Sequence, residues 1–239
     1  MRYLELTLPS IAENLALDEA LLDEAQASDV REETLRIWQA HSPFVVLGRS
    51  SRVDDEVDQA CTAEQSVPIF RRVSGGATVV AGPGCMFYAL VLSLEQRPHL
   101  RMLDVAHQFV MGSLQSALKS LLPQLEFDGT CDLVVSGRKV SGNSVRLVRD
   151  WMLYHGTLLL DMDLTLAERL LKHPPREPEY RGGRSHADFL ANLQIPYPAV
   201  VAAMRNQWQA DSQVGPIPES RIESLVRNKY SQDAWNLSR

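Results

Sequence analysis

The chain has 239 residues, a formal net charge of −6, 45% hydrophobic residues and 23% charged residues. A chain of this length buries about 70% of the surface that its unfolded form exposes, so this composition excludes a disordered tail, a fibrous repeat and a disulfide mini-protein. No apolar run approaches the roughly 18 residues of a membrane span, and the acidic balance disfavours non-specific binding to nucleic acid. We therefore expect a globular protein with no membrane and no nucleic-acid partner.

The three cysteines, Cys61, Cys85 and Cys131, are widely spaced and form no CxxC pair. This pattern predicts neither a structural zinc site nor a disulfide framework, and it indicates a reducing compartment, the cytoplasm. Residues 1–25 are acidic and contain no apolar signal-peptide core, so we expect no targeting segment.

Strand and helix signals follow one another irregularly along the chain. Helices are predicted where apolar residues recur every three or four positions, and strands where short apolar or alternating runs lie between turn residues. In chain order we predict a strand at 3–8, a helix at 14–27, strands at 34–39, 44–47, 69–73, 79–80 and 86–94, a helix at 104–122, a hairpin at 133–140, a strand at 152–160 interrupted by His155-Gly156, an irregular segment at 173–184, and helices at about 185–192, 197–211 and 219–230. Because this order is not a strict βαβ repeat, we expect an α+β fold.

The N-terminal part of the chain is strongly acidic. Residues 1–33 contain nine acidic residues and two arginines, and Asp18, Glu19, Asp23 and Glu24 lie on the polar side of the predicted helix 14–27. A charged helix side usually predicts a solvated surface, with a docking surface as the functional alternative.

Two arginines precede a Ser-Gly-Gly turn in RRVSGGA, residues 71–77. Glycine lets backbone N–H groups approach an anion closely, and arginine adds a planar fork of donors for a phosphate or carboxylate. The segment matches neither the P-loop nor the GxGxxG fingerprint. An anion site and a tight turn with surface arginines therefore both remain open, and Gly82-Pro83-Gly84 fits either a β-turn or a loop beside a ligand.

The segment DLVVSGRKVSGNS, residues 132–144, places one lysine and several small polar residues around a turn. A positive charge among small donors suits the charge that develops on a phosphate or acyl oxygen. Asp132 is a candidate Mg²⁺ ligand beside a polyphosphate. The alternative for Lys139 is a solvated side chain at a hairpin tip.

A histidine follows in YHGT, residues 154–157, where His155 is either a structural histidine or a group that shapes a substrate pocket. Asp161 and Asp163 follow the same strand and are expected to be turn residues. The absence of HExxH and GxSxG disfavours a zinc protease and an α/β-hydrolase.

Taken together and in this order, AENLALDEA, RRVSGGATVVAGPG, CDLVVSGRKVSGNS and YHGTLLLDMDL resemble the lipoate–protein ligase A family, which is grouped with the biotin ligases and the lipoyl/octanoyl transferases. The resemblance implies an α+β catalytic domain, with a mixed β-sheet flanked by helices. It implies activation of lipoate with ATP and Mg²⁺ to lipoyl-adenylate, followed by transfer of the lipoyl group to a lysine of a carrier protein. The implied carriers are lipoyl domains of 2-oxoacid dehydrogenases or the glycine-cleavage H protein.

The family's essential lysine falls on Lys139, which the resemblance makes catalytic. Arg72 is implied to face the phosphate or carboxyl end of the substrate, and Asp132 the metal and phosphates. The other implied substrate- or nucleotide-binding residues are Ser74, Gly75, Gly76, Ala77, Thr78, Val79, Gly142, Asn143, Ser144, Arg146, His155 and Gly156.

Two features keep other functions open. Ala77, Ala81, Gly82 and Cys85 replace residues common in the family's first loop, and Cys131 replaces the asparagine that often precedes the motif acid.

We expect residues 1–239 to form one catalytic domain with a helical C-terminal part from about 185 to 239 and no separate accessory domain. The alternatives to a ligase are an octanoyl/lipoyl transferase that uses a cysteine thioester, and a non-catalytic subunit that binds lipoyl domains. A ligase with a separate accessory subunit also fits.

Overall fold

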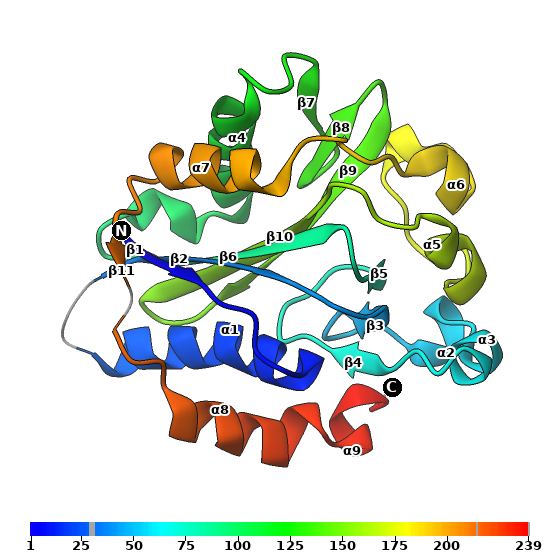
Figure 1. Ribbon diagram of the computed structural model, residues 1–239, viewed down its shortest axis with the longest axis horizontal. Coiled ribbons are helices and arrows are strands. Elements are labelled where there is room, and N and C mark those ends of the chain that lie inside the picture. Colours follow the sequence, from blue (N-terminus) through cyan, green and yellow to red (C-terminus); the bar gives the residue numbers. More distant parts are fainter. Residues whose placement is uncertain (29–31, 214, 239) are drawn as a thin grey trace.

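The computed structural model describes residues 1–28, 32–213 and 215–238. Within them, the largest sheet contains β1 (Arg2–Glu5), β2 (Thr34–Gln39), β6 (Cys85–Ser93), β7 (Leu125–Asp128), β8 (Asp132–Val135), β9 (Arg138–Leu147), β10 (Trp151–Leu159) and β11 (Ser212–Gln213). Its strand order is β11-β1-β2-β6-β10-β9-β8-β7 (Figure 1). β1 pairs in parallel with β2 and β11, and the other pairs are antiparallel. The sheet is therefore mixed, which confirms the α+β prediction.

Helices cover both faces of this sheet (Figure 1). One face carries α1 (Ile11–Ala27), α8 (Glu219–Leu225), the π-helix η3 (Val226–Tyr230) and α9 (Asp233–Asn236). The other carries η1 (Pro98–Arg101), α4 (Leu103–Leu118) and α7 (Tyr197–Gln207). Successive residues of a strand point to opposite faces, so in β6 Leu90 and Leu92 pack toward α4 while Ala89 and Val91 pack toward α1. This alternation explains why β6 is a continuous apolar run in sequence.

A second, smaller sheet lies beside the first. It consists of β4 (Ile69–Arg71), β3 (Phe44–Leu47) and β5 (Val79–Ala81), in the order β4-β3-β5. Trp38 and Phe87 of the large sheet stack 3.9 Å apart, centroid to centroid, within the apolar cluster that joins the two sheets. Short helices line this end: α2 (Val53–Glu56), α3 (Gln59–Glu64), α5 (Thr165–Leu170), η2 (Glu179–Arg181) and α6 (His186–Phe189).

The structure differs from several sequence predictions. The strand predicted at 3–8 ends at Glu5, where the chain turns into the capped start of α1. His155-Gly156 does not interrupt β10, because both residues pair regularly with β6 and β9. The short elements α2, α3, α5 and β7 were not predicted, since four to six residues carry little periodicity.

The acidic side of α1 is also not the solvated surface that was predicted. Asp18 is buried against the sheet, where Arg36 pairs with it. Glu19 is buried against the C-terminal helices, where Lys229 pairs with it. Among the described residues, every helix is too short or too polar to cross a lipid bilayer. The extent of the catalytic domain, 1–239, stays a prediction.

Candidate functional site

A cavity of about 200 Å³ opens between the small sheet, α1 and the central strands β9 and β10. Eleven residues that the sequence singled out line it: Arg72, Gly76, Ala77, Thr78, Val79, Lys139, Gly142, Asn143, Ser144, His155 and Gly156. Four others do not belong to its lining: Ser74, Gly75 and Asp132 contact residues that do, whereas Arg146 does not. The motifs, distant in sequence, thus meet at one place.

The Ser-Gly-Gly turn holds its carbonyl groups toward the protein. Gly75 O accepts hydrogen bonds from Arg72 and from Ser144 Oγ, the latter at 2.7 Å, and Ala77 O accepts from Arg72 Nη2 at 3.0 Å. Gly76 has φ +89°, which only glycine adopts without strain. Within the described residues, no acceptor meets the backbone N–H groups of Gly75, Gly76 or Ala77. These amides therefore remain available to a ligand, as the amides of an anion-binding nest do.

Arg72 binds the turn that follows it in the chain. Its guanidinium donates to the carbonyls of Val46, Gly75 and Ala77, and burial lowers its pKa to about 10. The guanidinium is thus engaged in fixing the shape of the turn. Arg72 also lines the cavity, so its predicted contact with the substrate stays a prediction.

Lys139 enters the cavity from the β8–β9 hairpin. Its Nζ lies 2.8 Å from Asp132 Oδ1, and the hydroxyl of Tyr180 donates to Asp132 Oδ2 at 2.8 Å. Lys139 remains partly exposed, at 23% of its side chain, whereas Asp132 is nearly covered. Asp132 therefore orients the ammonium group of Lys139 at the cavity.

Asn143 is locked in place behind Lys139. Its amide nitrogen donates to Cys131 O at 2.7 Å, and its oxygen accepts from the hydroxyl of Tyr88. Gly156 faces Asn143 across the two strands, and a Cβ there would lie only 1.9 Å from Asn143 Oδ1. Glycine is required at 156 because the two strands bring an amide side chain against its backbone.

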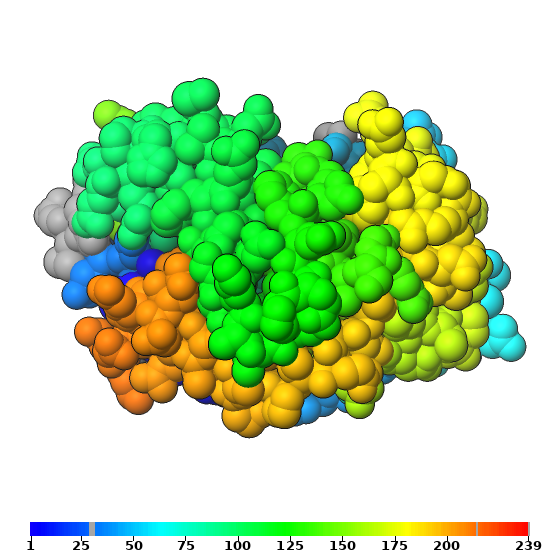
Figure 2. Space-filling model, turned by 90° about the horizontal axis from the view of Figure 1, so that it is seen from above, coloured from blue at the N-terminus to red at the C-terminus, as the bar shows by residue number. Residues whose placement is uncertain are grey.

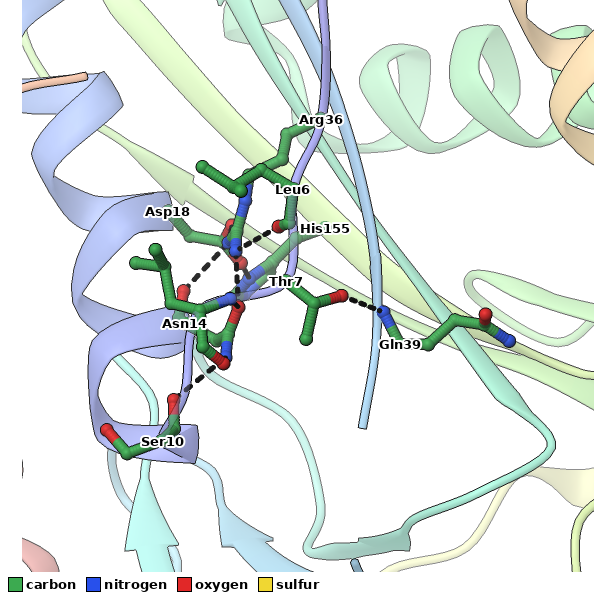
Figure 3. Close-up of polar contacts among 9 residues, drawn as sticks. Leu6, Thr7, Ser10, Asn14, Asp18, Arg36, Gln39 and His155 are labelled. Carbon is green, nitrogen blue, oxygen red and sulfur yellow. Dashed lines mark hydrogen bonds and ion pairs between the residues drawn. The ribbon is translucent and has the colours of Figure 1, made fainter. Parts of the chain in front are cut away.

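His155 lies on the opposite side of β10 from Tyr154, facing α1. Its Nε2 is 2.5 Å from Ser74 Oγ, and its Nδ1 is 3.6 Å from Asp18 Oδ2. Figure 3 shows Asp18 between His155 and Arg36, which donates to the other carboxylate oxygen. Burial alone would raise the pKa of Asp18, but the charge of Arg36 and the contact with His155 outweigh it, so that pKa is lowered.

Sequence reasoning missed the apolar part of the cavity. Trp38, Val46, Val80, Phe87, Leu159, Met162, Leu164 and Leu171 form this part. They come from two sheets and from the chain around α5, and each looks like an ordinary core residue in sequence. No local signal distinguishes such residues, because only the packing of the two sheets leaves space between them.

The irregular segment 173–184 forms part of the cavity rim, which sequence reasoning also missed. Pro174, Arg176, Pro178 and Arg181 line the opening, with His186, Phe189 and Leu190 following. Arg184 donates to Gly137 O and Arg138 to Ala187 O, each at 2.9 Å, so the segment is tied to the β8–β9 hairpin. Figure 2 shows it, in yellow, beside the green hairpin residues. The only sequence signal for this role was the arginine and proline content of the segment.

Arg146, predicted at the pocket, lies outside it. Its Nη1 is 3.8 Å from Glu19, which also binds Lys229 and Tyr230. Arg146 therefore contributes to a charged cluster that joins β9, α1 and the C-terminal helices. Arg146 lies two residues beyond Ser144 on β9, so its side chain is on the same α1 face but does not line the cavity.

Asp132 does not form a protein cage for a metal ion. Its two oxygens already bind Lys139 and Tyr180. Among the described residues, no group of three His, Cys, Asp or Glu side chains is placed to hold an ion. Mg²⁺ usually binds through one or two carboxylates together with substrate phosphates. The residues present therefore do not fit a resident metal, although one carboxylate could contact an ion carried by a polyphosphate.

The cysteines near the site are poor nucleophiles. Cys131 and Cys85 do not line the cavity. Burial raises the pKa of the Cys131 thiol to about 11, with Asp132 adding to the effect, and that of Cys85 to about 12. Because the thiolate is the reactive form, both thiols are almost unreactive near neutral pH.

Known proteins are similar in sequence to this chain along most of its length. Lipoate–protein ligase 1 of Staphylococcus aureus is 28% identical over 237 residues, 95% of this chain and 70% of that protein. A probable lipoate-protein ligase A of Mycoplasma pneumoniae is 30% identical over 190 residues, and the chain spans only 54% of its length. Octanoyltransferase LipM of Geobacillus kaustophilus is 24% identical over 262 residues, 95% of this chain and 94% of that protein.

Solved structures share the fold. A crystal structure of lipoate-protein ligase A bound with ATP has a TM-score of 0.80 at 22% identity and covers 99% of this chain and 98% of its own. A bi-partite lipoate protein ligase of Thermoplasma acidophilum, studied with its E2 lipoyl domain, has a TM-score of 0.78 at 21% identity, covering 99% and 95%. The family model described as lipoyl protein ligase A/B catalytic domain matches residues 10–207. The chain therefore belongs to the lipoyl protein ligase A/B catalytic domain family.

Proposed function

We propose that the chain is an ATP-dependent lipoate–protein ligase. The observation that carries this proposal is the division of the cavity lining between polar and apolar residues: Lys139 and the turn residues Gly76 and Ala77 on the one hand, and a set of apolar side chains on the other. Lipoate has the same division, because a carboxylate terminates an apolar chain with a dithiolane ring. A cavity that is apolar with a few convergent polar groups is typical of a small-molecule site.

In the first step a lipoate carboxylate oxygen attacks the α-phosphorus of ATP, and pyrophosphate leaves. Lys139 and the amides of the Ser74–Ala77 turn stabilise the negative charge that develops on the phosphate oxygens. Mg²⁺ would arrive with the triphosphate as part of the substrate, with Asp132, beside Lys139, as the protein carboxylate that we propose for it. The similarity to a ligase bound with ATP supports the choice of nucleotide.

In the second step the amine of a carrier lysine attacks the acyl carbon of lipoyl-adenylate, AMP leaves, and an amide forms. Lys139 again offsets charge on the acyl and phosphate oxygens. We propose a lipoyl domain of a 2-oxoacid dehydrogenase or a glycine-cleavage H protein as the carrier, with a separate accessory subunit as an added requirement. A bi-partite relative with its lipoyl domain supports this arrangement, and the free cysteines fit a cytoplasmic site.

The second candidate is an octanoyl or lipoyl transferase. The similarity to a LipM octanoyltransferase over 94% of that protein favours it. Such a mechanism needs a reactive thiolate, however, and neither the half-buried Cys131 nor the buried Cys85 lines the cavity or has a lowered pKa. We therefore place the ligase first, and a non-catalytic subunit that binds lipoyl domains last, because Lys139 and its partners are retained.

The deciding experiment incubates the purified chain with lipoate, ATP and Mg²⁺ and detects lipoyl-adenylate by mass. Lys139→Ala is expected to lower adenylate formation by on the order of 100-fold, the effect of removing one preorganised charge stabiliser. Lys119→Ala is the matched control, since Lys119 is an exposed lysine at the end of α4. Absence of adenylate from the wild-type chain, together with ATP-independent octanoyl transfer from a carrier protein, would overturn the ligase in favour of the transferase.

A further inference from the structure

Four side chains lie in one row across the central sheet. Strand pairing places Arg36 of β2 opposite Ala89 of β6, Ala89 opposite His155 of β10, and His155 opposite Ser144 of β9. All four occupy the face that α1 covers. Neighbouring strands lie about 4.8 Å apart, so the small side chain of Ala89 leaves a gap between Arg36 and His155.

Asp18 of α1 fills this gap. One carboxylate oxygen accepts from Arg36 Nη1, and the other faces His155 Nδ1 at 3.6 Å. Arg36 is itself fixed, because it also donates to Asn14 O, Asn14 Oδ1 and Leu6 O. Figure 3 shows Asp18 of α1, Arg36 of β2 and His155 of β10 together, with Asn14 of α1 also against Arg36.

This arrangement sets the tautomer of His155. Arg36 pairs with one oxygen of Asp18, and the other oxygen faces the imidazole. The carboxylate can only accept, so Nδ1 carries the proton toward Asp18. In a neutral ring with its proton on Nδ1, Nε2 accepts from the hydroxyl of Ser74, whose Oγ lies 2.5 Å away.

Ser74 in turn begins the glycine turn. Its carbonyl accepts from Arg49 N at 2.8 Å, and the next carbonyl, of Gly75, accepts from Ser144 Oγ at 2.7 Å. Ser74 is 1% exposed and does not line the cavity, so its hydroxyl cannot act on a substrate directly. The Ser74–His155 contact therefore joins the central sheet to the turn that faces the cavity.

We propose that Asp18 and His155 are positioning residues that hold the Ser74–Ala77 turn, with its open amides, in the geometry that binds the lipoate carboxylate and its adenylate. This inference rests on the proposed function for its substrate. The positioning of the turn does not depend on that function, because it follows from the contacts among Asp18, His155 and Ser74.

Asp18→Asn tests the inference with an almost isosteric change. Arg36 offers only donors, so it must keep the oxygen of the new amide side chain and leaves the NH₂ group facing His155. Nδ1 must then accept, the ring proton moves to Nε2, and Nε2 donates to Ser74. The hydroxyl hydrogen of Ser74 can no longer point at His155. A change of one atom type on α1 thus reaches the turn through the ring.

The experiment records nitrogen-15 spectra of the six histidines and amide spectra of the whole chain at about pH 8, with His155→Gln to identify the His155 signals. We expect the Nδ1–H tautomer in the wild type and Nε2–H in Asp18→Asn, with shifted amide signals for Gly75, Gly76 and Ala77. We also expect kcat for adenylate formation to fall by on the order of 100-fold while KM for ATP stays near wild type, since misplacement by about 1 Å costs that much.

Asp23→Asn is the matched control, because Asp23 lies on the same helix and pairs with Arg221, away from the cavity. Should Asp18→Asn fail to fold, Ser74→Ala takes its place, with the Nδ1–H tautomer kept, shifted turn amides and a lowered kcat. An Nε2–H ring in the wild type, or unshifted turn amides with unchanged kcat, would overturn the inference. A wild-type chain that makes no adenylate but has the expected tautomers and amide shifts would overturn the proposed function and leave the positioning contact standing.

Discussion

Lys139 Nζ and Asp132 Oδ1 lie 2.8 Å apart across the β8–β9 hairpin, and Tyr180 of the rim segment donates to the second oxygen of the same carboxylate. One side chain thus joins the cationic group of the cavity to the segment that borders its mouth. The aromatic ring of Tyr180 also packs on Phe189 of α6. The position of the rim segment and the position of Lys139 are therefore coupled through Asp132.

Tyr180→Phe is expected to loosen the rim segment while keeping the packing of the ring. The lost hydrogen bond to a charged acceptor is worth about 1.5–3 kcal/mol. The other contacts of the segment, such as that of Arg184 with Gly137 O, remain. Trypsin should then cleave after Arg176, which is exposed, several-fold faster than in the wild type. Tyr197→Phe, which removes a hydroxyl bound to Glu5, is the control with wild-type cleavage. Equal cleavage rates for wild type and Tyr180→Phe would contradict the coupling.

Gly156→Ala is expected to destabilise the fold by about 1–3 kcal/mol, the usual cost of overpacking. The new methyl group would lie 1.9 Å from Asn143 Oδ1 and 2.6 Å from Gly142 O, which is backbone and cannot move aside. Urea unfolding measures the change. Gly112→Ala is the matched control, because its methyl group meets no atom within 4 Å and alanine favours the helix α4. The control should be neutral or slightly stabilised, and a similar loss in both variants would refute the close approach at 156.

The thiols of Cys131 and Cys85 are expected to resist alkylation in the folded chain. With a pKa of about 11, Cys131 is only about 0.1% thiolate at pH 8, against roughly a quarter for a free cysteine. Iodoacetamide should therefore label Cys131 at least about 100-fold more slowly than in concentrated urea, with Cys85 slower still. Peptide mass spectrometry over time gives both rates. Labelling of native Cys131 at the rate of a free thiol would revive the transferase mechanism.

The contribution of Asp18 to stability is expected to depend on pH in the acid range. A carboxyl whose pKa is lowered by folding stabilises the native state above its unfolded pKa of about 3.9, and this stabilisation is lost as pH falls through the folded value. The difference in unfolding free energy between wild type and Asp18→Asn should thus be largest near pH 7 and shrink below about pH 4. Urea unfolding from about pH 7 down to the acid limit of folding measures it. A difference that stays constant with pH would mean that Asp18 gains no charge interaction on folding.

Local sequence signals predicted most of the long elements. The strands 34–39 and 44–47 have the predicted bounds. The helix α4 begins one residue before the predicted start and ends at Leu118, before the predicted end at 122. These segments have strong alternation or helical periodicity and are bounded by turn residues. Short elements such as α5 were missed because two turns of helix leave no measurable period.

Local patterns were enough to predict the family resemblance, the fold class and most of the polar residues of the cavity, because these depend on segments such as RRVSGGA and on glycines that permit close backbone approach. Three features could be seen only in the folded chain: the apolar wall around Trp38, the hydrogen bonds of Arg72 to the turn that it precedes, and the burial of Asp18 between Arg36 and His155. These contacts join residues on strands and helices that are far apart in the chain, so no local pattern reveals them. Charge on a helix side does not reveal whether water or an arginine on a neighbouring strand will meet it.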